Sequence, residues 1–127
     1  MWSSHRFGKE AERVALHYLR RQGYRILDHN VRFVHGELDL VARKGDVIVF
    51  VEVKARRTMD QGGAMYAVTP QKERRLIKLA AQYLARHGLS DRPCRFDVIL
   101  YQGDTPSLST LQHITNAFDA SGIDGCW

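Results

Sequence analysis

The sequence predicts one α/β domain in which a central mixed β-sheet is flanked by helices. A length of 127 residues suits a single compact domain with one core. The hydrophobic patterns follow the order α-β-β-β-α-β-β, which favours a mixed sheet with helices packed on it. A hydrophobic fraction of 44% and a charged fraction of 26% are ordinary for a soluble globular protein. We expect a single domain over residues 1–120 and a disordered C-terminal tail over residues 121–127.

The first helix is predicted over residues 7–21, and Gly23 ends it. Apolar side chains at helical spacing form one stripe: Phe7, Ala11, Val14, Ala15, Tyr18 and Leu19. Glu12 lies at the edge of this stripe, which is an awkward place for a carboxylate. The pattern leaves two interpretations open: Glu12 pairs with a neighbouring arginine, or it has a task in a functional site.

A short strand over residues 24–27, a turn over 28–30 and an extended stretch over 31–35 lead into a hairpin over residues 36–54. The first strand of the hairpin alternates acidic and aliphatic residues (GELDLVA), and the second is an aliphatic run (VIVFVEVK). A strand this apolar is normally covered on both faces. The charged side chains at its end are therefore costly unless they have partners.

Asp39, Glu52 and Lys54 are expected to share one face of this hairpin. Side chains two residues apart on a strand point the same way, so Glu52 and Lys54 lie together. If residues 44–45 form a two-residue turn, Asp39 lies opposite Phe50 and Glu52 is its diagonal neighbour, roughly 7 Å away at the backbone.

This arrangement has a chemical use. Two carboxylates can bind a hard cation such as Mg²⁺ or Mn²⁺, which polarises a phosphoryl oxygen and lowers the pKa of a bound water. The lysine can place a positive charge where negative charge grows on a phosphate. The pattern leaves a plainer interpretation open, in which the hairpin has a solvated end with a Glu–Lys ion pair.

The second helix is predicted to begin at Thr69 and Pro70 and to end before Gly88. Cations gather in its first half: Lys72, Arg74, Arg75 and Lys78. Their charges oppose the positive end of the helix dipole, so local stability does not explain them. A contact with phosphate would explain them, and a solvated helix face is the alternative.

Strands over residues 95–101 and 108–114 complete the predicted sheet. The six histidines are scattered, and none pairs with another at the spacing of a zinc site. We therefore expect the histidines to lie at the surface or at its boundary.

Several classes of protein are disfavoured by what the sequence lacks. No apolar run approaches the roughly 18–20 residues of a membrane span, and the polar N-terminus has no signal-peptide core. Cys94 and Cys126 have no metal or redox spacing, which predicts buried or idle thiols in a reducing cytoplasm. Without a Walker A loop or a G-x-G-x-x-G motif, no nucleotide cofactor is expected. A net charge of +5 and a pI of about 9.5 favour a polyanionic partner such as nucleic acid.

Several motifs resemble those of the YraN family of small bacterial proteins. They are G-x-x-A-E at 8–12, Y-L-x-x-x-G-Y at 18–24, GELDLVA at 36–42, FVEVKAR at 50–56, Ala67-Val68, Lys72 and RFDVIL at 95–100. The resemblance covers the chain from about Gly8 to Phe118. The YraN family is similar in turn to archaeal Holliday-junction resolvases. The resemblance therefore implies a restriction-endonuclease-like fold, whose core is a central mixed sheet in the order α-β-β-β-α-β.

The resemblance also assigns roles by position. Asp39 and Glu52 match the metal-binding acids of the D…E-x-K nuclease motif, and Lys54 matches its catalytic lysine. Glu12 matches a first-helix glutamate that holds the metal or its water, and Val53 would lend only its backbone carbonyl to the metal. The wider superfamily usually has proline before the motif aspartate, where this chain has leucine.

The resulting hypothesis is a Mg²⁺- or Mn²⁺-dependent endodeoxyribonuclease that acts on branched or structured DNA. The expected contacts to the DNA backbone are Arg13, Arg56, Arg57, Lys72 and Arg75. A resolvase would act as a homodimer, although the sequence shows no dimer interface. The alternative hypothesis is a non-catalytic nucleic-acid-binding module that works with a DNA-processing partner.

Overall fold

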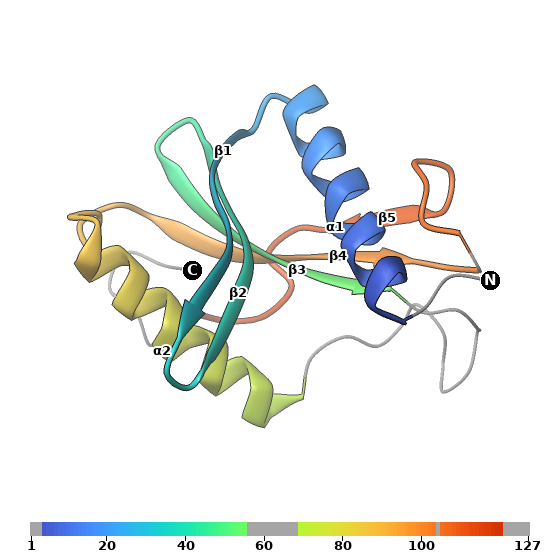
Figure 1. Ribbon diagram of the computed structural model, residues 1–127. Helices are drawn as coiled ribbons and strands as arrows, with labels where there is room; N and C mark the ends of the chain where they lie inside the picture. The colour runs from blue at the N-terminus through green and yellow to red at the C-terminus, as the bar shows by residue number, and fades with distance from the viewer. Residues whose placement is uncertain (1–3, 56–68, 104, 121–127) are drawn as a thin grey trace.

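The computed structural model describes residues 4–55, 69–103 and 105–120 (Figure 1). Its elements are α1 (Ser4–Arg21), β1 (Arg25–Phe33), β2 (Gly36–Lys44), β3 (Val47–Ala55), α2 (Pro70–Arg86), β4 (Cys94–Tyr101) and β5 (Leu111–Ile114). This order is the one that the sequence predicts. The predicted tail over residues 121–127 lies outside the described residues.

The strands form one five-stranded sheet in the order β1-β2-β3-β4-β5. The β3–β4 pair is parallel and the other pairs are antiparallel, so the sheet is mixed. The helix α2 belongs to the crossover that a parallel pair requires. The helices α1 and α2 pack on opposite faces of the sheet (Figure 1). The predicted α/β class is confirmed, and the architecture is consistent with a restriction-endonuclease-like fold.

The strand β3 lies between two layers of core. Ile48 and Phe50 pack against the apolar face of α2, whereas Val49 and Val51 pack against that of α1. All four side chains are buried. This alternation explains why the strand is aliphatic on both faces, as the sequence predicts.

The N-terminus of α2 is set by local capping. The hydroxyl of Thr69 accepts a hydrogen bond from the backbone N–H of Lys72 at 3.1 Å, and Pro70 follows at the first helical position. Leu76 and Tyr83 are among the buried side chains that fasten the helix to the sheet. The predicted start and end of this helix are confirmed.

The predicted turn over residues 28–30 is wrong, because β1 is one continuous strand. A bulge between Ile26 and Asp28 and a positive φ of 49° at Asn30 absorb the turn-forming residues inside the strand. Asparagine tolerates this left-handed conformation better than most residues do. The strand therefore twists without leaving the sheet.

A polar network is buried where β4 meets β5. Asp97 is 1% exposed and accepts hydrogen bonds from Arg95 at 3.0 Å and from the backbone N–H of Asn116 at 3.0 Å. His113 Nε2 lies 2.8 Å from Asp97, and its Nδ1 lies 2.9 Å from the hydroxyl of Tyr18. Burial alone would raise the pKa of Asp97, but these partners outweigh it and hold the pKa below its usual value. His113 is therefore a boundary residue, as expected, whose side chain points inward and supports the sheet.

Cys94 is buried at the start of β4, as the sequence allows, but it is disulfide-bonded, so the expectation of a thiol is wrong for this residue. No helix in the described part of the chain has both the length and the hydropathy to cross a membrane.

Candidate functional site

The candidate site lies where β2 and β3 separate, a place that we call the fork. The last pair between these strands is Leu40 with Val51. Beyond it, β2 follows β1 as far as Gly36, while β3 follows β4 as far as Ala55. Figure 1 shows the β1–β2 hairpin bending away from β3 toward α2. The fork therefore exposes the end of an otherwise buried strand.

The register of the hairpin differs from the predicted one by two residues. Lys44 pairs with Val47, so the turn is formed by Gly45 and Asp46, and Gly45 supplies the positive φ of 60°. Because Leu40 pairs with Val51, Asp39 comes next in line beside Glu52 and not opposite Phe50. A shift of two residues preserves the faces of both strands, so the predicted grouping of side chains survives.

The carboxylate of Asp39 takes the place of a backbone partner inside the fork. Its Oδ2 accepts a hydrogen bond from the backbone N–H of Val53 at 2.9 Å. The N–H and C=O of one strand residue point to the same side, so the carbonyl of Val53 also faces the side of Asp39. This placement agrees with the role that the resemblance gives to Val53.

Glu52 and Lys54 lie next to each other on β3. The Nζ of Lys54 is 4.0 Å from Oε1 of Glu52, and the two side chains are 22% and 12% exposed. Glu52 borders a small cavity that is otherwise lined by apolar side chains, including Leu38, Leu76 and Phe96. An ionised carboxylate is therefore poorly solvated at this position.

The pKa values of the two carboxyls reflect this burial. Burial raises the pKa of Asp39 to about 6, against the hydrogen bond from Val53, and the Glu12 carboxylate adds to the rise. Burial raises the pKa of Glu52 to about 8, and the neighbouring Asp39 adds to the rise. Burial also lowers the pKa of Lys54 from its ordinary value. Burial thus disfavours the charged forms of all three side chains, and their mutual attraction does not offset this cost.

Each helix contributes one charged residue to the surroundings of the fork, Glu12 from α1 and Lys72 from α2. Glu12 lies close enough to Asp39 to act on its pKa, and its Oε1 accepts a hydrogen bond from the side-chain amide of Asn30 at 2.9 Å. Lys72, in the first turn of α2, lowers the pKa of Lys54 further. The sequence predicts Lys72 as a DNA contact, and the structure places it beside Lys54.

The donor set fits a divalent cation in its chemistry. Within the described residues, no group of three or more His, Cys, Asp and Glu side chains is gathered closely enough to hold a metal. Mg²⁺ needs no such group, because it keeps several waters and is commonly bound by one or two carboxylates together with substrate phosphates. Asp39 and Glu52 supply two carboxylates that are short of positive charge.

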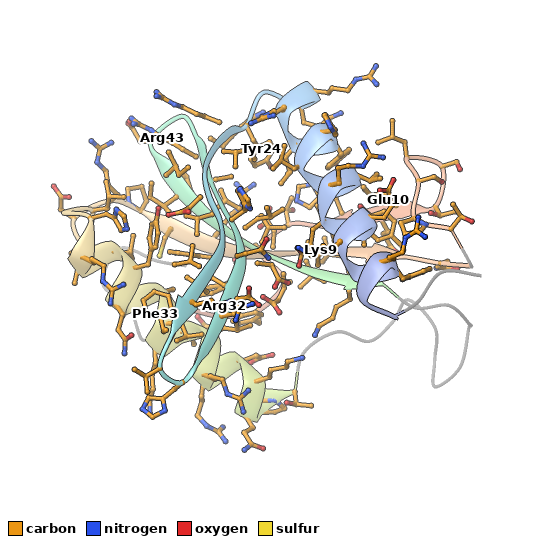
Figure 2. All side chains as sticks on the ribbon, viewed as in Figure 1. Lys9, Glu10, Tyr24, Arg32, Phe33 and Arg43 are labelled. Carbon is orange, nitrogen blue, oxygen red and sulfur yellow. The ribbon has the colours of Figure 1, made fainter. Side chains whose placement is uncertain are left out.

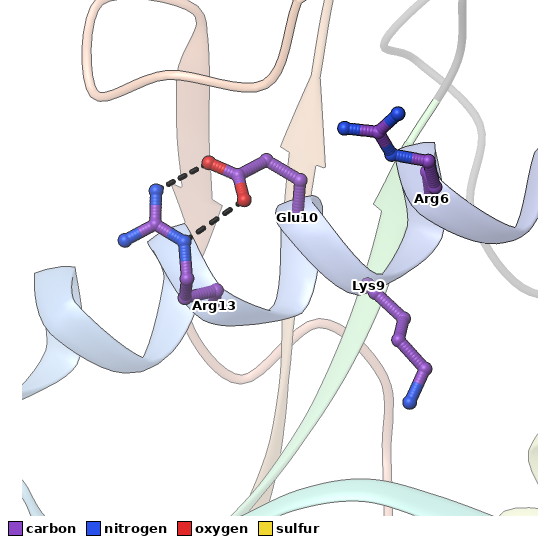
Figure 3. A pocket seen from close by; sticks show the side chains of 4 residues that line it. All are labelled: Arg6, Lys9, Glu10 and Arg13. Carbon is purple, nitrogen blue, oxygen red and sulfur yellow. Dashed lines mark hydrogen bonds and ion pairs between the residues drawn. The ribbon is translucent and has the colours of Figure 1, made fainter. Parts of the chain in front are cut away.

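The other predicted DNA contacts are spread over the molecule. Arg13 lies on the exposed face of α1, and its guanidinium donates two hydrogen bonds to Glu10, one of them at 2.9 Å (Figure 3). Arg75 lies on the exposed surface of α2. Arg56 and Arg57 lie outside the described residues.

Sequence reasoning missed two residues that shape the fork. Asn30, predicted in a turn, holds the carboxylate of Glu12. Glu37 precedes Asp39 by two residues and raises the pKa of Asp39 by its negative charge. No local pattern identifies Asn30, because its partner lies eighteen residues away along the chain.

Comparison with known proteins gives a consistent result. The model of the uncharacterised protein family UPF0102 matches residues 11–101. A UPF0102 protein of Symbiobacterium thermophilum is 47% identical over 117 residues, which cover 92% of this chain and 99% of the relative. A UPF0102 protein of Geobacter sulfurreducens is 47% identical over 112 residues, which cover 88% of each chain. A third, from Alkalilimnicola ehrlichii, is 45% identical over 116 residues, which cover 91% of this chain and 88% of the relative.

Proposed function

Since the chain belongs to the uncharacterised protein family UPF0102, which is the YraN family, and its D…E-x-K residues meet in the fork, we propose that it is a metal-dependent endonuclease. The proposed reaction is hydrolysis of phosphodiester bonds in branched or otherwise structured DNA.

The observation that carries this proposal is the pair of buried carboxylates in the fork. Two acids in an apolar setting, with Lys54 and Lys72 as their near cations, weaken the fold when both are ionised. The positive charge of a bound divalent cation would offset the two buried negative charges. Residues whose pKa values are perturbed by burial and by like charges together often belong to catalytic or binding sites.

The residues of the fork have distinct tasks in this proposal. Asp39, Glu52 and the carbonyl of Val53 would hold Mg²⁺ or Mn²⁺, and Glu12 would hold the metal or one of its waters. When bound, such an ion polarises the phosphoryl oxygen and lowers the pKa of its water. Lys54 places a positive charge where the phosphate gains negative charge.

A homodimer would complete the activity on a four-way junction. Cleavage of both strands needs two sites, and a two-fold axis supplies them in the symmetry of the junction. A second candidate function, a non-catalytic nucleic-acid-binding module, is favoured by the cations on α2 that have no partner within the described residues. It predicts salt-sensitive DNA binding without a cleaved product.

The test uses wild type, Asp39→Asn and Asp46→Asn. Asp46 lies in the β2–β3 turn, at the other end of the same hairpin, so it is a matched control. Mn²⁺ is titrated calorimetrically into each protein, and the samples are then incubated with a labelled four-way junction. Asp39→Asn should abolish metal binding and reduce cleavage at least about 100-fold, because the amide is a poor substitute for a carboxylate ligand. Its DNA binding and its fold should persist.

Cleavage by Asp39→Asn at the wild-type rate would show that the site is assigned wrongly. Metal binding by wild type without cleavage of any branched or linear DNA would favour the binding module. The control Asp46→Asn should behave as wild type in both measurements.

A further inference from the structure

A basic hollow lies between α2 and the β1–β2 turn. Its volume is about 450 Å³, and its lining consists of His35, Gln71, Arg74, Arg75, Lys78, Leu79 and Gln82. Arg32 and Phe33, at the end of β1, mark this side of the molecule in Figure 2. We call it the α2 hollow.

The cations of the α2 hollow have no protein counter-charge in the part of the chain that the structure describes. There, Arg74, Arg75 and Lys78 take part in no ion pair or hydrogen bond, and no carboxylate lines the hollow. Arg74 and Arg75 lie in the N-terminal half of α2 and gain nothing from the helix dipole, which favours cations only at the C-terminus. The helix thus carries a charge pattern that its own stability does not favour.

A second basic hollow lies on α1, but its cations are partly paired with other residues. It is lined by Arg6, Lys9, Glu10 and Arg13, and Glu10 is paired with Arg13 (Figure 3). Arg6 also has an interaction of its own. The α2 hollow is therefore the stronger candidate for an external anion.

The cations of α2 form a path that begins at the fork. Lys72, Arg75 and Lys78 are spaced three residues apart and lie along one ridge of the helix. Leu76, one turn after Lys72, lines the same small cavity as Glu52, so one end of the ridge is at the candidate site. Six residues of helix span about 9 Å, which is the axial rise of two to three nucleotides of a duplex.

Gly36 holds the β1–β2 turn against this ridge. A Cβ atom at Gly36 would lie 3.1 Å from the end of the Leu79 side chain and 3.4 Å from that of Arg75, so a larger residue would crowd this contact. The turn supplies His35 as the opposite wall. Packing of Gly36 against α2 therefore sets the distance between His35 and the cations across the hollow.

From this geometry we infer that the α2 hollow binds the phosphodiester backbone of the DNA strand that leaves the scissile phosphate. The inference rests on the proposed function and deepens it, because it gives the substrate strand a direction across the protein. Backbone contacts of this kind position DNA without reading its sequence.

The test compares Arg74→Gln/Lys78→Gln with Arg20→Gln/Arg21→Gln. Each pair removes two positive charges, and Arg20 and Arg21 lie in the last turn of the other helix. Binding of a fluorescein-labelled four-way junction is followed by anisotropy in EDTA over a series of salt concentrations. The slope of log K against log salt should become shallower by roughly 0.9 for each phosphate that is no longer neutralised, and only in Arg74→Gln/Lys78→Gln.

Equal slopes in the two double variants would overturn the inference. Cleavage of the same junction by wild type with Mn²⁺ is measured in parallel. Cleavage together with equal slopes leaves the proposed function intact and refutes only the strand path. A wild type that neither binds nor cleaves the junction refutes both.

Discussion

At the scale of single residues, Glu52 shows a conflict between position and stability. Burial, followed by the charge of Asp39, raises the pKa of Glu52 from 4.5 to about 8. The folded state therefore binds the proton of Glu52 more tightly than the unfolded state does. The resulting stabilisation is complete at low pH and is lost as the pH rises from about 4.5 toward 8.

The variant Glu52→Gln should remove most of this pH dependence. In EDTA, the free energy of unfolding of wild type should fall between pH 5 and pH 8.5 by on the order of 2 kcal/mol, and that of Glu52→Gln should fall much less. At pH 8.5 the variant should be the more stable protein, because it has no buried charge at this position. Urea unfolding at a series of pH values measures both effects.

The control for this prediction is Asp46→Asn, which removes a carboxylate from an exposed turn. Its side chain is 82% exposed, so its stability curve should run parallel to that of wild type. A Glu52→Gln curve that also runs parallel to wild type would mean that Glu52 stays ionised in the fold.

At the scale of elements, the contact between the β1–β2 hairpin and α2 determines the shape of the candidate site. Gly36 has a φ of +156° and lies against Leu79, and Arg86 lies over the ring of Phe33 at 4.9 Å. These contacts bend the hairpin away from β3. They shape both the fork and the α2 hollow.

Gly36→Ala should therefore be more destabilising than Gly45→Ala. Both glycines have positive φ, but a Cβ at Gly45 meets nothing within 4 Å, whereas one at Gly36 meets Leu79 at 3.1 Å. The strained backbone alone costs about 1 kcal/mol, and the crowding at Gly36 adds about 1–3 kcal/mol. Chemical denaturation measures the difference, and equal destabilisation of the two variants would refute the packing role of Gly36.

At the scale of the whole molecule, the fork gathers residues from four elements. Glu12 comes from α1, Asp39 from β2, Glu52 from β3 and Lys72 from α2. They meet because β2 follows β1 while β3 follows β4, and because the helices cover opposite faces of the sheet. No single segment carries the site.

A cation bound in the fork should stabilise the entire fold. Mn²⁺ at 100 times its dissociation constant adds about 2.7 kcal/mol, which should raise the Tm of wild type by several degrees. The rise should be larger at pH 8 than at pH 5.5, because the carboxyls must lose their protons to bind metal. Differential scanning fluorimetry measures this, and an equal rise in Asp39→Asn would place the bound ion elsewhere.

Local sequence patterns were sufficient to predict the features that depend on neighbouring residues. The element order, the cap at Thr69 and the burial of β3 on both faces follow from local periodicity and capping. The shared face of Glu52 and Lys54 follows from the two-residue period of a strand. Even the wrong register kept Asp39 on the correct face, because the error was an even number of residues.

Features that depend on distant partners emerged only from the folded molecule. The hydrogen bond between Asn30 and Glu12 and the burial of His113 against Asp97 join segments with no common local signal. Continuity of β1 through its turn-like residues was imposed by pairing with β2, which outweighs the local preference for a turn. The nearness of Lys72 to Lys54 likewise arises from the packing of α2 across the sheet, because sequence spacing fixes directions along one element and not distances between elements.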